Sequence, residues 1–258
     1  MAKSASSVDW LNRVFGDSKY SDLTIECGES TWHVHRVVIC AQSPFFDKAC
    51  SNGFKETSSK LIKLEDDDPT IVREMLRYLY TGDYLEQTKE GEEGSRRSAL
   101  STNVHIHTIA DKYDIPALGD VAISKFSARA AREWKTEAFA GAIEEMYTSA
   151  NENKEPMHKA AVAIAAENAK TLLNDDCGQA FRKIAEAVPK FAAELSIEIV
   201  NMKEKMPPTF ARYRCPNSMR CNKVNMLEGL GQASGSRTCT YCSNQYYVNV
   251  WVSKKLDD

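Results

Sequence analysis

Residues 21–46 read SDLTIECGESTWHVHRVVICAQSPFF, and this stretch decides the fold. Two short runs, at 22–25 and 31–35, are typical of strands, and the glycine-bearing turn between them joins the runs into a hairpin. Ser43 and Pro44 then predict the start of a helix, because serine caps a first turn and proline needs no amide partner there. The stretch therefore predicts a β-hairpin that is followed by a helix.

The same helix signal recurs further along the chain. Asp68 and Pro69 repeat the combination of cap and proline, and the helix that they begin is expected to end at Gly82. From Val104 to Glu194 the apolar residues recur at helical spacing, and a single alanine-rich helix is expected at 156–173. A small sheet followed by many helices predicts an α+β fold.

Six segments occur in an order that resembles the BTB/POZ domain family, in the form found in fungal proteins. The resemblance covers about residues 20 to 130 and implies a three-stranded sheet capped by a cluster of helices. It also implies a protein-binding role: members self-associate, bind the cullin scaffolds of ubiquitin ligases, or recruit transcriptional co-regulators. The segments are SDLTI (21–25), WHVHRVVI (32–39), SPFF (43–46), FKE (54–56), LYTGDY (79–84) and ADKYDIPAL (110–118).

We expect four parts along the chain. Residues 1–19 form an N-terminal extension with a short helix, and 20–132 form the BTB/POZ domain. Within the domain, 86–98 is polar and highly charged and is predicted to be a flexible insert. An all-helical segment follows at 133–206, and a small cysteine-rich, zinc-ribbon-like tail at 207–258.

The bulk composition places limits on the class of protein. Hydrophobic residues make up 43% of the chain and charged residues 27%, which is ordinary for a globular protein, and the net charge is −3. No apolar run reaches the roughly 18 residues that a membrane helix needs, and the first residues lack the apolar core of a signal peptide. We therefore expect a cytoplasmic or nuclear location, no membrane partner, and reduced cysteines.

Four of the eight cysteines crowd into the tail, at Cys215, Cys221, Cys239 and Cys242. The Cys-x-x-Cys pair has the spacing of a zinc knuckle, whereas the first pair is spaced more widely than usual. Few large apolar residues precede Tyr246 to Val252, which alternates as a strand, so a metal staple is expected to replace a core. The predicted cofactor is structural zinc, because four thiolates leave no position for a catalytic water. The alternative is four free thiols.

The tail is also basic. Residues 212–258 carry seven basic and three acidic side chains, a balance of +4, which four thiolates and one zinc ion would reduce by two. A solvated surface is the favoured explanation, so we expect no nucleic acid partner. The alternative is a transcription-linked protein whose basic cysteine tail contacts nucleic acid through the interleaved tyrosines.

Phe54-Lys55-Glu56 is the candidate partner-binding site. It matches the hydrophobic-x-Glu pattern that the resemblance associates with cullin-binding BTB domains. The apolar residue would be an anchor in a groove of the partner, and the carboxylate would fix the register. In the alternative reading Phe54 packs into its own core and Glu56 is solvated, which leaves an adaptor with another partner or a homodimeric scaffold.

No catalytic residues are predicted. The chain contains no GxSxG, no phosphate-binding glycine loop and no HExxH, so we expect neither an enzyme nor a small-molecule substrate. Asp22 and His35 are interpreted as a buried polar pair that satisfies backbone groups rather than as an acid and a base. His35 is assigned to the core and His33 to its rim. His105 and His107 point to different sides of a helix and make a poor metal pair.

Overall fold

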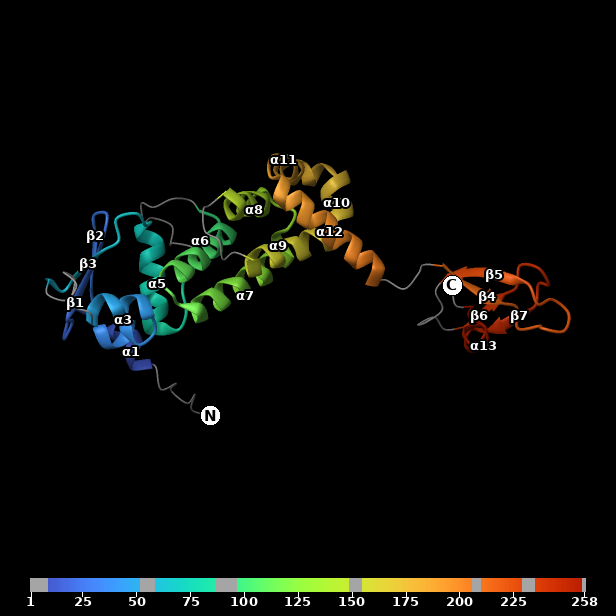
Figure 1. Cartoon of the computed structure of the whole chain (residues 1–258), viewed down its shortest axis with the longest axis horizontal. Coiled ribbons are helices and arrows are strands. Elements are labelled where there is room, and N and C mark those ends of the chain that lie inside the picture. Colours follow the sequence, from blue (N-terminus) through green and yellow to red (C-terminus); the bar gives the residue numbers. More distant parts are fainter. Residues whose placement is uncertain are drawn as a thin grey trace. The chain divides into compact units, whose positions relative to one another are not determined.

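The structure is a computed structural model that describes residues 9–51, 59–86, 97–148, 155–205, 210–228 and 235–256. The chain divides into two compact units, residues 1–198 and residues 199–258 (Figure 1). Each unit is described by itself. The finer domain boundaries expected from the sequence, at 132 and 206, stay predictions. None of the described helices combines the length and the hydropathy of a membrane span.

A three-stranded sheet opens the first unit. Strands β1 (Leu23–Cys27) and β2 (Ser30–Val34) are antiparallel, with Leu23 opposite Val34, and strand β3 (Leu61–Lys63) pairs in parallel with β1. The hairpin turns at Gly28, whose φ of 55° suits a residue without a side chain. Alternate residues of β1 are buried, which gives the sheet one face toward the core. The predicted hairpin is confirmed.

The predicted helix starts are confirmed at both proline positions. Helix α3 (Pro44–Ser51) begins after Ser43, whose hydroxyl oxygen accepts from the Phe46 amide at 3.2 Å. Helix α5 (Pro69–Thr81) begins after Asp68, whose carboxylate accepts from the Thr70 amide at 2.7 Å. It ends at Gly82 with a left-handed φ of 74°. Two short helices, α1 (Asp9–Val14) and α2 (Arg36–Cys40), pack against α5.

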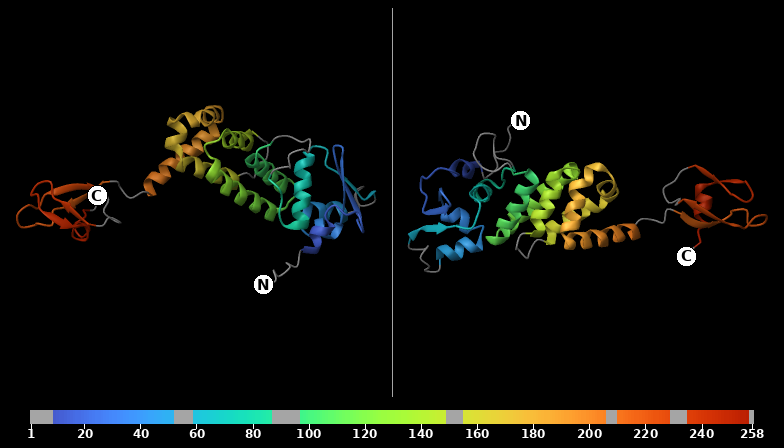
Figure 2. Two further views of the ribbon diagram at one scale, coloured as in Figure 1. Left: turned by 180° about the vertical axis from the view of Figure 1, so that it is seen from behind. Right: turned by 90° about the horizontal axis from the view of Figure 1, so that it is seen from above.

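The remaining helices follow in the first unit, whose boundary at residue 198 lies within the last of them, α12. Helix α6 contacts α5, α7 and α8, and α7 contacts α9 (Figure 2). The single helix expected at 156–173 is wrong, because the chain leaves helical geometry at Asn168, which has φ −107° and ψ 10°. The elements are α6 (Ala99–Lys112), α7 (Pro116–Glu133), α8 (Glu137–Thr148), α9 (Glu155–Glu167), α10 (Ala169–Asn174), η1 (Asp176–Gly178), α11 (Gln179–Ala187) and α12 (Pro189–Lys205).

Hydrogen bonds fix both ends of the predicted insert at 86–98: a polar network at its start and a helix cap at its end. Arg129 of α7 donates to both carboxylate oxygens of Glu86, at 3.2 and 2.8 Å, and Asn103 of α6 donates to Glu86 at 2.8 Å. The Tyr84 hydroxyl in turn donates to Asn103 at 2.5 Å. At the other end Ser98 caps α6, so both ends are ordered; residues 87–96 lie outside the described residues.

The second unit contains two short hairpins and a helix. Strands β4 (Phe210–Arg214) and β5 (Val224–Glu228) form one hairpin, and β6 (Ser236–Thr238) and β7 (Gln245–Tyr247) form the other. The strand expected at 246–252 is wrong beyond Tyr247, because residues Val248–Val252 form helix α13. A helix brings Val248 and Trp251 onto one face, and both are buried there.

Candidate metal centre and docking surface

The loops of the two tail hairpins have the same construction. In the first, the Cys215 amide donates to the Lys223 carbonyl at 2.8 Å; in the second, the Cys239 amide donates to the Asn244 carbonyl at 2.9 Å. In each loop the residue after the second cysteine has a positive φ, 48° at Asn222 and 58° at Ser243. Both hairpins therefore present their cysteines from tight, similarly closed loops.

The four predicted cysteines come together in the structure. All four sulfur atoms lie within 4.8 Å of one another, and within the described chain this is the only group of three or more His, Cys, Asp or Glu side chains that could share a metal ion. Sγ of Cys215 lies 3.7 Å from Sγ of Cys242, and Sγ of Cys221 lies 3.7 Å from Sγ of Cys239. Each short distance joins one loop to the other, so an ion would clamp both hairpins.

These distances fit metal coordination. A sulfur atom about 2.3 Å from tetrahedral zinc lies about 3.8 Å from its neighbours, whereas a disulfide would need about 2.05 Å. Cys215 and Cys239 are buried, while Cys221 and Cys242 are half-buried. A set of four thiolates is the donor chemistry of zinc and of iron. The four cysteines can therefore hold a metal ion.

Hydrogen-bond donors around Cys239 favour its thiolate. Burial by itself would raise the pKa of this thiol, but the backbone amides of Cys242 and Tyr241 and the Asn225 side chain donate to the sulfur and lower its pKa to about 6. The Asn225 amide nitrogen lies 3.5 Å from Sγ, and Asn225 Oδ1 accepts from the Thr240 amide at 3.0 Å. Sequence reasoning missed Asn225, since a lone strand asparagine carries no motif.

The cysteines are also part of a small core. Buried Tyr213, Val248 and Trp251 pack with them, and half-buried Leu227 and Tyr246 flank the cluster. The Trp251 indole N–H donates to the Arg237 carbonyl at 3.1 Å. The tail thus has more apolar packing than the sequence suggests, but the cysteines lie inside that packing and are not separable from it.

The candidate partner-binding residues Phe54, Lys55 and Glu56 lie outside the described residues, in the gap between Ser51 and Ser59. Helix α3 ends at Ser51, directly before this gap. The prediction that these residues bind a partner therefore stays a prediction.

Asp22 and His35 serve the backbone of the first unit. The Asp22 carboxylate accepts from the Arg36 amide at 2.8 Å, at the start of α2. Asp22 is exposed, so the interpretation of Asp22 and His35 as a buried pair is wrong for Asp22, which bonds a backbone amide from the surface. Nε2 of His35 donates to the Lys19 carbonyl at 2.9 Å, and Nδ1 accepts from the Tyr80 hydroxyl at 2.9 Å. His35 is 8% exposed and His33 is exposed, which confirms their assignment to core and rim.

Two strongly exposed apolar residues occur close in the chain to His35 and to its hydrogen-bond partner Lys19. Tyr20 is 83% exposed and Val37 is 78% exposed. Tyr20 follows Lys19, whose carbonyl accepts from His35, and Val37 lies two residues after His35 in α2; we call Tyr20 and Val37 the hub patch. Large apolar side chains that are this exposed are candidates for a surface that contacts another protein.

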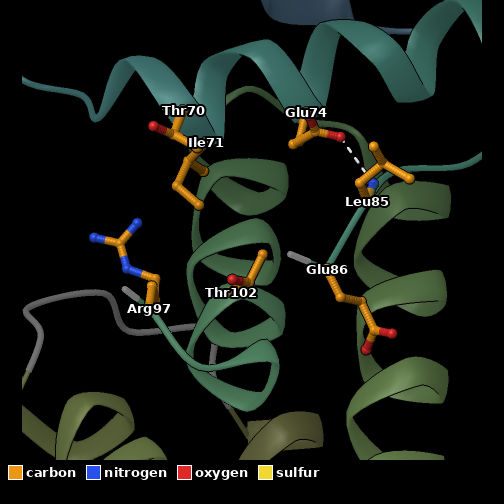
Figure 3. Close-up of a pocket in the computed structure, with 7 residues that line it drawn as sticks. All are labelled: Thr70, Ile71, Glu74, Leu85, Glu86, Arg97 and Thr102. Carbon is orange, nitrogen blue, oxygen red and sulfur yellow. Dashed lines mark hydrogen bonds between the residues drawn. The ribbon is translucent and has the colours of Figure 1, made fainter. Parts of the chain in front are cut away.

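Two hollows of the first unit are too small for an ordinary ligand. One cavity of about 20 Å³ has room for about one water. Beside it, buried Glu74 accepts from the Leu85 amide at 2.8 Å (Figure 3). Its lining is Thr70, Ile71, Glu74, Leu85, Glu86, Arg97 and Thr102. A more open hollow of about 200 Å³ lies where α6 turns into α7, whereas ligand sites usually have about 300–1,000 Å³.

Comparison with known proteins finds a family match within the first unit. The family model of the BTB/POZ domain matches residues 11–129. BTB/POZ domain-containing protein 1 of Schizosaccharomyces pombe is 32% identical over 114 residues, which are 40% of this chain and 8% of that protein. Kelch-like protein 41b of Danio rerio is 25% identical over 119 residues, which are 45% of this chain and 18% of that protein.

Among solved structures, the BTB domain of zebrafish PATZ1 is similar, with 19% identity and a TM-score of 0.36; the match covers 47% of this chain and 93% of that one. The alignment with each of the two curated relatives covers less than a fifth of that relative's length.

Proposed function

Residues 11–129 form a BTB/POZ domain, and from this premise we propose that the protein is a non-enzymatic adaptor that binds other proteins. The observation that carries the proposal is the exposed hub patch on a domain of a protein-binding family, with Val37 at 78% and Tyr20 at 83% exposure. The small size of the two hollows agrees with a surface that docks polypeptides rather than a small-molecule substrate.

The partner that we propose is the cullin scaffold of a ubiquitin ligase. Support comes from Phe54-Lys55-Glu56, which matches the hydrophobic-x-Glu pattern, and from the similarity of the chain to Kelch-like proteins. An apolar side chain that enters a pocket at the centre of an interface commonly carries a large share of the binding energy.

Phe54→Ala should weaken binding to the N-terminal half of a purified cullin by about tenfold or more, because truncation of a central anchor costs about 2 kcal/mol. Isothermal titration with full-length protein measures the change. Leu173→Ala is the matched control, since Leu173 is 42% exposed but lies far along the chain in α10. Wild-type protein that gives no binding heat with any cullin would remove this part of the proposal.

We also propose that a second copy of the chain covers the hub patch. Val37 lies on α2, whose other face buries Val38 and Ile39, so its outward face has no cover within the described residues of its own unit. Homodimer formation would remove this apolar surface from water.

Val37→Glu should convert a dimer to a monomer, because it places a charge where apolar contact is needed. Light scattering after size exclusion gives the mass directly, with the 28.9 kDa chain as reference. Val200→Glu is the control, since Val200 is 53% exposed and lies on α12. If wild-type protein runs as a monomer at all concentrations, the dimer proposal fails.

For the second unit we propose a structural zinc ion on Cys215, Cys221, Cys239 and Cys242. Four protein ligands would close the coordination sphere, so the ion would supply folding energy and no bound water for catalysis. The eight free thiols also support a reducing location, and we propose the cytoplasm or the nucleus.

A further inference from the structure

The two cysteine loops bring five exposed or charged residues to one end of the tail unit. Met219 and Arg220 come directly before Cys221, and Tyr241 comes directly before Cys242. Since the sulfurs of Cys221 and Cys242 lie within 4.8 Å, the two loop tips are neighbours. Met219 is 97% exposed and Tyr241 is 64% exposed.

Two further cations lie at the first loop. The Arg214 guanidinium contacts Asn222, at 3.5 Å from its carbonyl and 3.4 Å from its side-chain oxygen. Lys223 follows Asn222 and is exposed. We call Arg214, Met219, Arg220, Lys223 and Tyr241 together the loop-end surface.

The charged residues of the loop-end surface are all positive. Residues 215–223 and 239–244 contain no aspartate or glutamate. Within the described part of the tail, no ion pair joins Arg214, Arg220 or Lys223 to a carboxylate. The tail from residue 212 onward carries +4 whereas the chain carries −3, so the first 211 residues carry −7. Charge of one sign is therefore concentrated in the tail.

Hydrogen bonds hold the backbone around Tyr241, the aromatic residue of this surface. The Tyr241 amide donates to Sγ of Cys239 at 3.4 Å, and the Ser243 amide donates to the Cys239 carbonyl at 2.9 Å. The backbone of Tyr241 is thus held while most of its side chain faces water. An exposed aromatic ring on one loop, beside a second loop that carries cations, offers a face on which unpaired bases can stack while their phosphates meet the cations.

We infer that the loop-end surface binds single-stranded nucleic acid. Phosphates match Arg214, Arg220 and Lys223 in sign, and a base can lie on the Tyr241 ring. The carboxylates of an acidic peptide would use the cations but have no aromatic face to stack on the ring. Duplex nucleic acid keeps its bases paired, so the ring would have no partner there. This binding would be independent of the adaptor role of residues 11–129.

Fluorescence anisotropy of full-length protein with a labelled oligothymidylate of about 20 nucleotides tests the inference, with an oligouridylate and a duplex as further arms. We expect binding at about 50 mM salt that weakens steeply by about 200 mM, and little binding to the duplex. Tyr241→Ala should weaken binding by about tenfold, while Tyr241→Phe should keep it, because the ring remains.

Arg220→Glu should weaken binding and lower the salt dependence by about one phosphate contact. The matched control is Arg132→Glu, a charge reversal at an exposed position of the first unit, which should leave nucleic acid binding unchanged. Metal content measured on each variant shows whether the tail remains folded.

Three results would overturn the inference: no rise in the anisotropy of the probe at low salt, equal affinity of Tyr241→Ala and wild-type protein, or displacement of the probe by polyglutamate as effectively as by unlabelled oligothymidylate. The last result would indicate an acidic protein as the partner. A fourth contradicting result is unchanged nucleic acid affinity of Arg220→Glu together with loss of metal, which would show that the cations only offset the charge of the thiolates.

Discussion

Replacing Cys239 by serine should unfold residues 210–256 and abolish stoichiometric metal content. Cys239 is fully buried, makes one of the two 3.7 Å contacts between the loops, and receives the Asn225 and Tyr241 donors. Zinc bound to such peptides contributes about 10–16 kcal/mol of apparent folding energy, more than a core of this size supplies. The same unfolding should follow removal of the metal by a chelator, and added zinc should reverse it.

Elemental analysis and the amide NMR spectrum of the tail measure this outcome together. Cys177→Ser is the control, because Cys177 is an exposed free cysteine outside the cluster and its loss should leave metal and spectrum unchanged. If iron is found at one ion per chain instead of zinc, a metal ion still joins the two hairpins, and only the identity of the ion differs from the prediction. A tail that gives the same dispersed spectrum after complete removal of metal would contradict the structural role.

Arg129→Ala should lower the free energy of unfolding of the first unit by about 2–3 kcal/mol, because charge-assisted hydrogen bonds to a half-buried carboxylate are lost together. Arg129 bonds both Glu86 and Glu133 and thereby ties the residues before the insert to α7. Urea unfolding measures the loss, and Arg132→Ala, on an exposed position of the same helix, should change it by less than about 0.5 kcal/mol.

The same network predicts a pH dependence. Burial would raise the pKa of Glu86, but the Arg129 and Asn103 donors outweigh it and hold the pKa below its usual 4.5. A carboxyl group whose pKa is lower in the folded state stabilises the fold above pH 4.5 and loses that contribution as pH falls below it. The difference in free energy of unfolding between wild-type protein and Glu86→Gln should therefore become smaller as the pH falls below 4.5. A difference that grows below pH 4.5 would contradict this.

Local signals in the sequence predicted much of the fold. Ser43-Pro44 and Asp68-Pro69 each combine a side-chain cap with a residue that needs no amide partner. Each pair is therefore enough to predict the start of a helix. The turn at Gly28 could also be predicted, because glycine adopts a positive φ more readily than other residues. The order of these signals, more than any one of them, pointed to the family that matches residues 11–129.

Features that depend on distant partners could not be predicted. Residues 246–252 alternate like a strand, yet Trp251 makes its buried contacts only if Val248–Val252 is a helix. The link between Tyr84, Asn103 and Arg129 joins segments that are far apart in sequence. The cysteine spacing predicted a metal site, but the pairing of Cys215 with Cys242 and of Cys221 with Cys239 required the fold of both hairpins.

Cross-linking mass spectrometry on complexes purified with the full-length protein tests the adaptor account most directly. Exposed lysines of the first unit, such as Lys48, Lys60 and Lys63, report contacts to partner chains. We predict that cross-links to other polypeptides concentrate within residues 11–129 and disappear in a Phe54→Ala, Val37→Glu double variant that remains folded. Partner cross-links confined to the second unit, and unchanged in the double variant, would contradict the account.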